Sequence, residues 1–241
     1  MALERSELFY ENKYLAKNDP WDYAKKAVEI LKYEAIIKII TGLKKEKAYN
    51  RVLEVGCSKG QFSIMLNNYA AEIYAIDISE TAVQKAQLAC SSFLEEGGSK
   101  YFFEKGNASS LSYRDNFFDL ILLSDGINEW FNSDEDKIKT LNETWRVLKP
   151  GGFAVISDYQ SHRNFENYLN TIKACKLKIA EVHYLYDRFC YQFNSWFKLF
   201  DNTVIADFIY RNITLAKFLE TISKLFGKKG AKHLIVIGVK E

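Results

Sequence analysis

The feature that most constrains this chain is an apolar segment that runs directly into a glycine-containing turn. Residues 52–60 read Val-Leu-Glu-Val-Gly-Cys-Ser-Lys-Gly, and an apolar-periodic segment follows at 62–66. Gly56 and Gly60 allow the backbone to turn sharply and a ligand to approach where a Cβ atom would collide. The next helix begins with free N–H groups and the positive end of its dipole. The pattern predicts the nucleotide-binding corner of a doubly wound α/β fold.

Three kinds of site can use such a turn. A dinucleotide site requires three glycines as G-x-G-x-x-G, whereas this chain has G-x-S-x-G. A hydrolase nucleophile elbow fits G-x-S-x-G literally, but it normally follows several strands, and the first fifty residues have a mainly helical pattern. That elbow also needs a later histidine, and His233 lies in an apolar run, where we expect a structural role. An S-adenosylmethionine site carries an acidic residue in the first strand, as Glu54 is here, and this third interpretation is favoured.

Further strands near 72–76, 100–104 and 118–123 support it, because each ends in residues suited to a nucleotide ligand. An acid 23 residues after Glu54 can accept both hydroxyls of a ribose. A Leu-Lys-Pro-Gly-Gly segment at 148–152 then ends a helix and begins a fifth strand. The residues at the three strand ends are Asp77 with Ile78, Asn107 with Ala108, and Ser124 with Asp125.

Because these motifs follow one another in order along the chain, residues 50–160 resemble the class I S-adenosylmethionine-dependent methyltransferases. Upstream, Asp-Pro-Trp-Asp-Tyr at 19–23 and Glu-x-x-Lys-Tyr at 29–33 resemble the N-terminal signature of the NodS-like enzymes, whose named member N-methylates an amino sugar. The resemblance implies that Trp21 and Lys32 enclose the cofactor, with Lys32 pairing with its methionine carboxylate. Lysine lacks the bidentate fork of the arginine that also serves there, and Trp21 can alternatively anchor the N-terminal helix in the core. The implied cofactor-binding residues are Trp21, Lys32, Glu54, Gly56, Cys57, Ser58, Gly60, Asp77, Ile78, Asn107, Ala108 and Ser124.

Periodicity predicts one helix before the sheet, with Asp19 as its N-cap and Pro20 at its first position. Strands near 51–55, 72–76, 100–104, 118–123, 152–157, 177–185 and 233–239 then alternate with helices, which is typical of a mostly parallel sheet. The expected fold class is an α/β, Rossmann-like, doubly wound seven-stranded sheet; the resemblance implies an antiparallel last strand. We expect an N-terminal helical cap at 1–48, a cofactor-binding core at 49–186, a helical insertion at 187–231 and the final core strand at 232–241.

Composition narrows the class of function. The net charge of +2 argues against a nucleic-acid partner. The four cysteines show no C-x-x-C spacing, and the sequence suggests neither a metal site nor a signal peptide. No apolar run reaches membrane-spanning length. We therefore expect a cytoplasmic protein with free thiols and without a metal.

The insertion at 187–231 is rich in aromatic residues, which include Tyr191, Trp196 and Phe200. A helical pattern then runs from Ile205 to Phe226, and Gly227 is expected to end it. We expect a lid over the acceptor. A homodimer or partner surface is the second interpretation, and membrane contact through 205–232 is the least favoured.

Methyl transfer requires a nucleophile aligned with the departing sulfur. Asp125 is the first candidate to orient an amine acceptor and Glu129 the second. His162, just past the fifth strand, is the histidine considered as a general base. Tyr10 and Tyr14 are placed to cover the sulfonium. The sequence thus predicts N-methylation of a small-molecule acceptor, an amino sugar or sugar-bearing metabolite. The alternatives are O-methylation of an aromatic or lipid-like acceptor, and an inactive cofactor-binding partner protein.

Overall fold

The computed structural model describes residues 2–44, 49–91, 98–131, 133–197 and 204–241. Its centre is one seven-stranded sheet with the order β3-β2-β1-β4-β5-β7-β6. Neighbouring strands are parallel except at β7, which runs antiparallel to both β5 and β6. The predicted fold class, including the antiparallel last strand, is therefore confirmed. The strands are β1 Tyr49–Val55, β2 Ala70–Asp77, β3 Lys100–Lys105, β4 Phe118–Ser124, β5 Leu148–Tyr159, β6 Lys178–Leu185 and β7 His233–Val239.

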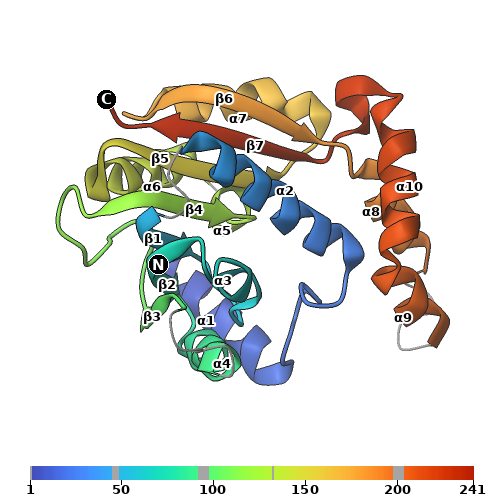
Figure 1. Cartoon of the computed structure of the whole chain (residues 1–241), viewed down its shortest axis with the longest axis horizontal. Coiled ribbons are helices and arrows are strands. Elements are labelled where there is room, and N and C mark those ends of the chain that lie inside the picture. The colour runs from blue at the N-terminus through green and yellow to red at the C-terminus, as the bar shows by residue number, and fades with distance from the viewer. Residues whose placement is uncertain (1, 45–48, 92–97, 132, 198–203) are drawn as a thin grey trace.

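Helices cover both faces of the sheet (Figure 1). Alternate residues of a strand point to opposite faces, so that Val52 and Leu120 pack with α2 and α3, whereas Leu53 and Ile121 pack with α6 and α7. Both faces are apolar, as expected for a parallel sheet buried on two sides. The helices are α2 Ala27–Leu43, α3 Gln61–Met65, α4 Glu80–Ser91, α5 Ile127–Trp130, α6 Asp134–Val147 and α7 Phe165–Lys173, with a short 3-10 helix, η1 His162–Asn164, before α7.

The chain reverses its direction of travel across the sheet at β1. It runs outward from β1 to β2 and β3, and then returns to place β4 on the other side of β1. In doubly wound folds the ligand-binding crevice lies beyond the carboxyl ends of the strands at such a switch point. The topology therefore places the site beyond Val55, Asp77 and Ser124, the last residues of β1, β2 and β4.

The N-terminal region contains two helices rather than the one predicted. Helix α1 covers Ala2–Ala16, and α2 begins at Ala27, so the expected helix start at Pro20 is wrong. The Asp19 carboxylate instead accepts the N–H groups of Tyr23 and Ala24, both at 3.1 Å, which stabilises a turn. Asp22 has a φ of 60°, a left-handed conformation that cannot continue a helix.

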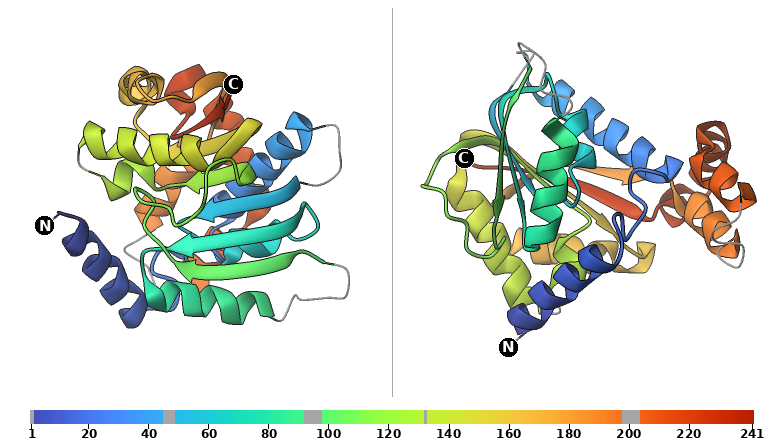
Figure 2. Two further views of the ribbon diagram at one scale, coloured as in Figure 1. Left: turned by 90° about the vertical axis from the view of Figure 1, so that its left-hand side faces the viewer. Right: turned by 90° about the horizontal axis from the view of Figure 1, so that it is seen from below.

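Helix α1 lies against α4 (Figure 2). The Ser79 hydroxyl, which also caps α4 by accepting the N–H of Ala82 at 3.1 Å, donates to Glu11 at 2.6 Å. Lys85 of α4 donates to the carbonyl of Tyr14 at 2.5 Å. These contacts hold α1 beside the carboxyl ends of β1 and β2, so that Tyr10 and Tyr14 lie at the crevice.

The insertion forms α8 Arg188–Phe197, α9 Val204–Arg211 and α10 Ile213–Lys224, followed by a short 3-10 helix, η3 Gly227–Gly230. The helical pattern predicted from Ile205 to Phe226 is divided at Asn212, whose side chain accepts the N–H of Leu215 at 2.9 Å and begins α10. Phe200 lies outside the described residues. The three helices stand at one end of the sheet beside α2, and α10 contacts both α2 and α8 (Figure 1). Within the described ranges, no helix has the length and hydropathy needed to cross a membrane.

Candidate active site

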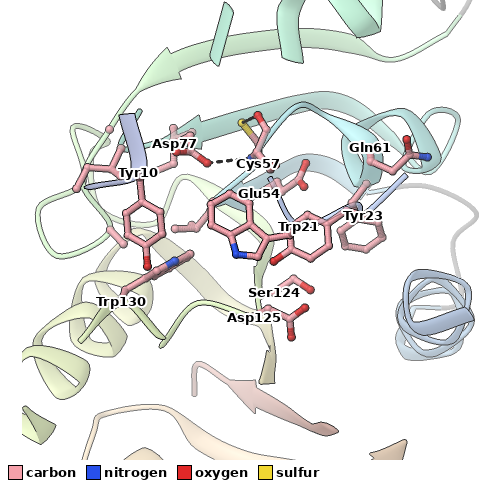
Figure 3. A pocket seen from close by; sticks show the side chains of 18 of the residues that line it. Tyr10, Trp21, Tyr23, Glu54, Cys57, Gln61, Asp77, Ser124, Asp125 and Trp130 are labelled. Carbon is pink, nitrogen blue, oxygen red and sulfur yellow. Dashed lines mark hydrogen bonds between the residues drawn. The ribbon is translucent and has the colours of Figure 1, made fainter. Parts of the chain in front are cut away.

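A cavity of about 970 Å³, measured out to its open mouth, lies at the switch point. Figure 3 shows residues from the N-terminal region and from three strand ends around it. Most of the predicted site residues lie in its wall, whereas Lys32, Gly60 and His162 lie outside the wall. The predicted residues that line the cavity are Trp21, Glu54, Gly56, Cys57, Ser58, Asp77, Ile78, Asn107, Ala108, Ser124 and Asp125.

Asp77 is fixed at the end of β2 by backbone donors. One carboxylate oxygen accepts the N–H of Ser58 at 2.9 Å (Figure 3), and the other accepts the N–H of Ser79 at 3.0 Å. Its side chain is buried, and burial raises the pKa of Asp77 to about 6. A carboxylate has about four acceptor positions, so Asp77 can still accept a ligand hydroxyl.

The glycine turn is rigid because its own N–H groups are used internally. Those of Gly56 and Cys57 both donate to the carbonyl of Ile76, at 2.8 and 2.9 Å. Gly60 has a φ of 83°, and a Cβ atom there would lie 3.1 Å from the backbone of Ala86 in α4. The glycine at 60 therefore serves close packing of the turn against α4, which explains why it lies behind the cavity wall.

Glu54 lies under the turn, near the end of β1. It is buried and accepts a hydrogen bond from the hydroxyl of Ser63 in α3. Burial raises the pKa of Glu54 to about 8; the Ser63 bond opposes this and the nearby Asp77 adds to it. The acid predicted within the first strand is thus a largely protonated group at neutral pH.

Aromatic side chains of the N-terminal region form a cluster that covers one side of the cavity. The ring of Trp21 lies 5.3 Å from that of Tyr14 and 6.0 Å from those of Tyr10 and Tyr23, centroid to centroid. Burial, with a smaller contribution from Asp77, raises the pKa of Tyr14, so its hydroxyl stays neutral. Trp21 both lines the cavity and packs at the centre of this cluster (Figure 3).

Asp125 lies just beyond β4, at the opposite side of the cavity from Asp77 (Figure 3). Its φ of 56° is left-handed, and its N–H donates to the carbonyl of Ser157 at 2.7 Å. Lys32, almost fully buried on α2, donates to Asp125 and, at 2.7 Å, to Glu29. The ammonium predicted to pair with a ligand carboxylate is therefore bonded to two carboxylates of the chain itself.

His233, the first residue of β7, was expected to be structural but contacts this site. Its Nε2 lies 3.0 Å from Asp125 Oδ1, and its Nδ1 bonds to Asp187, the residue before α8. The fold class contained the signal, because an antiparallel last strand begins at the edge where the parallel strands end. His162, in contrast, lies on η1 away from the cavity wall, and the side chain of Glu129 lies outside the described part of the structure.

Comparison with known proteins agrees with this architecture. Residues 53–156 match the family described as a methyltransferase domain. The probable methyltransferase ltbC of Aspergillus luteorubrus is 33% identical over 117 residues, which cover 46% of this chain and 41% of that protein. Norajmaline N-methyltransferase of Rauvolfia serpentina is 32% identical over 137 residues, covering 56% of this chain and 44% of that protein. The chain thus aligns with less than half the length of these curated relatives.

The solved structure of the N-methyltransferase NodS from Bradyrhizobium japonicum WM9, in complex with S-adenosyl-L-homocysteine, superposes with a TM-score of 0.65 at 14% identity and covers 98% of both chains. At that identity the similarity establishes the fold, here including the N-terminal region and the insertion. Residues 53–156 thus match a methyltransferase domain in sequence, and the predicted resemblance to the NodS-like class I methyltransferases is confirmed.

Proposed function

We propose that the protein is an S-adenosylmethionine-dependent methyltransferase that methylates the amine of a small molecule, an amino sugar or sugar-bearing metabolite. The observation that carries the proposal is the buried carboxylate of Asp125, which faces the same cavity as Asp77 and is held by Lys32. The N-methyltransferases among the similar proteins support the amine as acceptor.

The residues of the cavity fit S-adenosylmethionine. Ser124 Oγ is buried and has no partner among the described residues, so the wall holds a polar atom that a ligand can satisfy. Asp77 would hold the ribose hydroxyls, Asn107 and Ala108 would border the adenine, and Trp21 would cover the cofactor. When bound, the cofactor supplies a methyl group already activated on a sulfonium.

The chain itself then has two tasks. It must hold the acceptor nitrogen about 3 Å from the methyl carbon, and it must keep that nitrogen neutral, because an ammonium ion has no lone pair. Asp125 can accept an N–H of the acceptor and thereby aim the lone pair, and it can take the proton that the nitrogen releases. Lys32 compensates the charge of Asp125, so this carboxylate does not simply stabilise the ammonium form.

An aromatic acceptor remains the second candidate, because Trp130 and Phe131 line the cavity next to Asp125. A phenolic acceptor would use the same carboxylate as a base toward its hydroxyl.

The test is methyl transfer from radiolabelled S-adenosylmethionine to a panel of amino sugars, small amines and phenols. Asp125→Asn is compared with wild type and with Glu181→Gln, a matched control on the exposed part of β6. We expect Asp125→Asn to lower turnover about 100-fold or more while the affinity for S-adenosylhomocysteine is retained.

Unchanged turnover in Asp125→Asn would refute the assigned role. Transfer to phenols alone would replace the amine by the second candidate. Tight cofactor binding without transfer to any member of the panel would favour the inactive partner protein.

A further inference from the structure

A chain of charged side chains lies behind the acceptor end of the cavity. It connects Asp187 to His233, His233 to Asp125, Asp125 to Lys32, and Lys32 to Glu29. Their side chains are 1–12% exposed, so water contributes little to their solvation. Charges buried to this extent are expensive unless they are paired. The five residues therefore form one cooperative unit.

Both ends of this unit reach the insertion. Asp187 precedes α8 and also accepts the backbone N–H of Lys232 at 2.9 Å through its other oxygen. Tyr191 of α8 donates to Glu29 at 2.7 Å. The side of α8 that faces the sheet is thus bonded to the residues that hold Asp125.

The geometry at His233 fixes how many protons lie between its ring nitrogens and the two carboxylates that they face. Nδ1 bonds to Asp187, and Nε2 lies within ion-pair distance of Asp125, 3.0 Å from its buried Oδ1. Two lone pairs facing each other at these distances repel, so each nitrogen–oxygen pair must contain a proton. Asp187, His233 and Asp125 are therefore either an imidazolium between two carboxylates, or a neutral imidazole between one carboxylate and one carboxylic acid.

We propose that His233 is a positioning residue of the acceptor site: held at Nδ1 by Asp187, it fixes Asp125 through a proton at Nε2, and it thereby makes the insertion part of acceptor recognition. This rests on the proposed function of Asp125. With Lys32 at one oxygen and the protonated Nε2 at the other, Asp125 keeps one orientation and a compensated charge. Both properties favour a neutral, correctly aimed amine.

Other charged and aromatic groups also face His233 and contribute to its environment. The nearest rings are those of Tyr159 and Tyr191, each 5.4 Å from the imidazole, centroid to centroid. Asp158 and Glu29 are each coupled electrostatically to His233. The groups around the imidazole are Asp125 on the β4 end, Asp158 and Tyr159 on β5, Asp187 and Tyr191 at α8, and Glu29 and Lys32 on α2.

Two substitutions separate the two contacts of His233. The amide nitrogen of glutamine can occupy the position of Nε2 and reach Asp125, whereas that of asparagine can occupy the position of Nδ1 and reach Asp187. His183→Gln is the control, because His183 is exposed and pairs with Glu181. We expect His233→Gln to keep turnover within about tenfold of wild type and His233→Asn to lose about 100-fold, with S-adenosylhomocysteine affinity unchanged in both.

The second readout needs no acceptor. Nuclear magnetic resonance of the ¹⁵N-histidine-labelled full chain, saturated with S-adenosylhomocysteine, reports the ring protons of its three histidines. We expect His233 to show an exchange-protected Nε2–H signal that is altered in Asp125→Asn, and an Nδ1 resonance that is altered in Asp187→Asn.

An Nε2 that carries no proton, or whose proton signal does not respond to Asp125→Asn, would overturn the proposal. Turnover of His233→Asn equal to that of wild type would do so as well. If the ring signals are as expected but amines are never methylated, the proposed function fails while the proton between His233 and Asp125 stands. If the variants unfold, the presence or absence of a protected Nε2–H signal in wild type still tests the proposal.

Discussion

The indole of Trp130 occupies the space that a side chain on Gly56 would need. A Cβ atom at Gly56 would lie 2.5 Å from Cζ2 of Trp130, far inside van der Waals contact. Gly56 also has a φ of 78°, which L-residues rarely adopt. Glycine is thus required at position 56 for two reasons: the backbone is left-handed there, and Trp130, which follows β4, fills the space beside it.

We predict that Gly56→Ala destabilises the protein and weakens binding of S-adenosylhomocysteine. Gly151→Ala is the matched control, because Gly151 has a φ of 74° but no atom within 4 Å of its Cβ position. Both variants should lose about 1–2 kcal/mol of unfolding free energy to the left-handed backbone, measured by urea denaturation. Gly56→Ala should lose more and should also bind more weakly by calorimetry. Equal effects in the two variants would contradict the contact with Trp130.

The raised pKa of Glu54 predicts that the free energy of unfolding depends on pH. Because burial raises its pKa from 4.5 to about 8, the folded protein retains a proton that the unfolded chain has lost between these values. The stability contributed by Glu54 therefore falls as pH rises through this window, by at most about 1.4 kcal/mol per pH unit, and is constant above it. Glu54→Gln can still accept the bond from Ser63 and removes this titration.

The free energy of unfolding of Glu54→Gln relative to wild type should accordingly grow from pH 5 to pH 8 and then level off. Glu72→Gln provides a control without this slope: Arg51 holds the pKa of Glu72 below its usual value, so above pH 5 this carboxyl is largely ionised in both the folded and the unfolded chain. A difference between Glu54→Gln and wild type that does not vary with pH would show that Glu54 is ionised throughout.

Trp21 should contribute to cofactor affinity rather than to global stability. Trp21→Leu removes a ring that contacts Tyr14 and lines the cavity, and we expect about a tenfold weaker Kd for S-adenosylhomocysteine, or about 1.4 kcal/mol. Trp196→Leu is the control, because Trp196 lies on α8 with 71% of its surface exposed. Calorimetric titration of both variants measures the effect; equal Kd values would assign Trp21 to packing alone.

The strands and most of the residues that line the cavity could be predicted from the sequence because their signals are local. Apolar runs mark the strands, and residues such as Asp77 and Asn107 follow them directly. The topology then gathers these strand ends at one edge of the sheet without further information.

The acceptor-side network could not be predicted in this way, because it depends on packing between distant segments. Tyr191 reaches Glu29, and Asp187 reaches His233, only once the insertion has docked beside α2 and β7. The start of α2 differs from the prediction for a local reason: Asp19 has the features of a helix cap, but its carboxylate accepts the N–H groups of Tyr23 and Ala24 in a turn, and the helix begins only at Ala27.

The measurement that tests the account most directly is calorimetric titration with S-adenosylhomocysteine, with NAD as control ligand, on wild type and on Asp77→Asn at pH 5 and pH 7. Because the pKa of Asp77 is raised to about 6, its carboxylate becomes available as pH rises, and wild type should bind about tenfold more tightly at pH 7 than at pH 5. Asp77→Asn should bind more weakly at pH 7 and without this dependence, and NAD should not bind. If Asp77→Asn binds as tightly as wild type, or if NAD alone binds, the cavity is not an S-adenosylmethionine site.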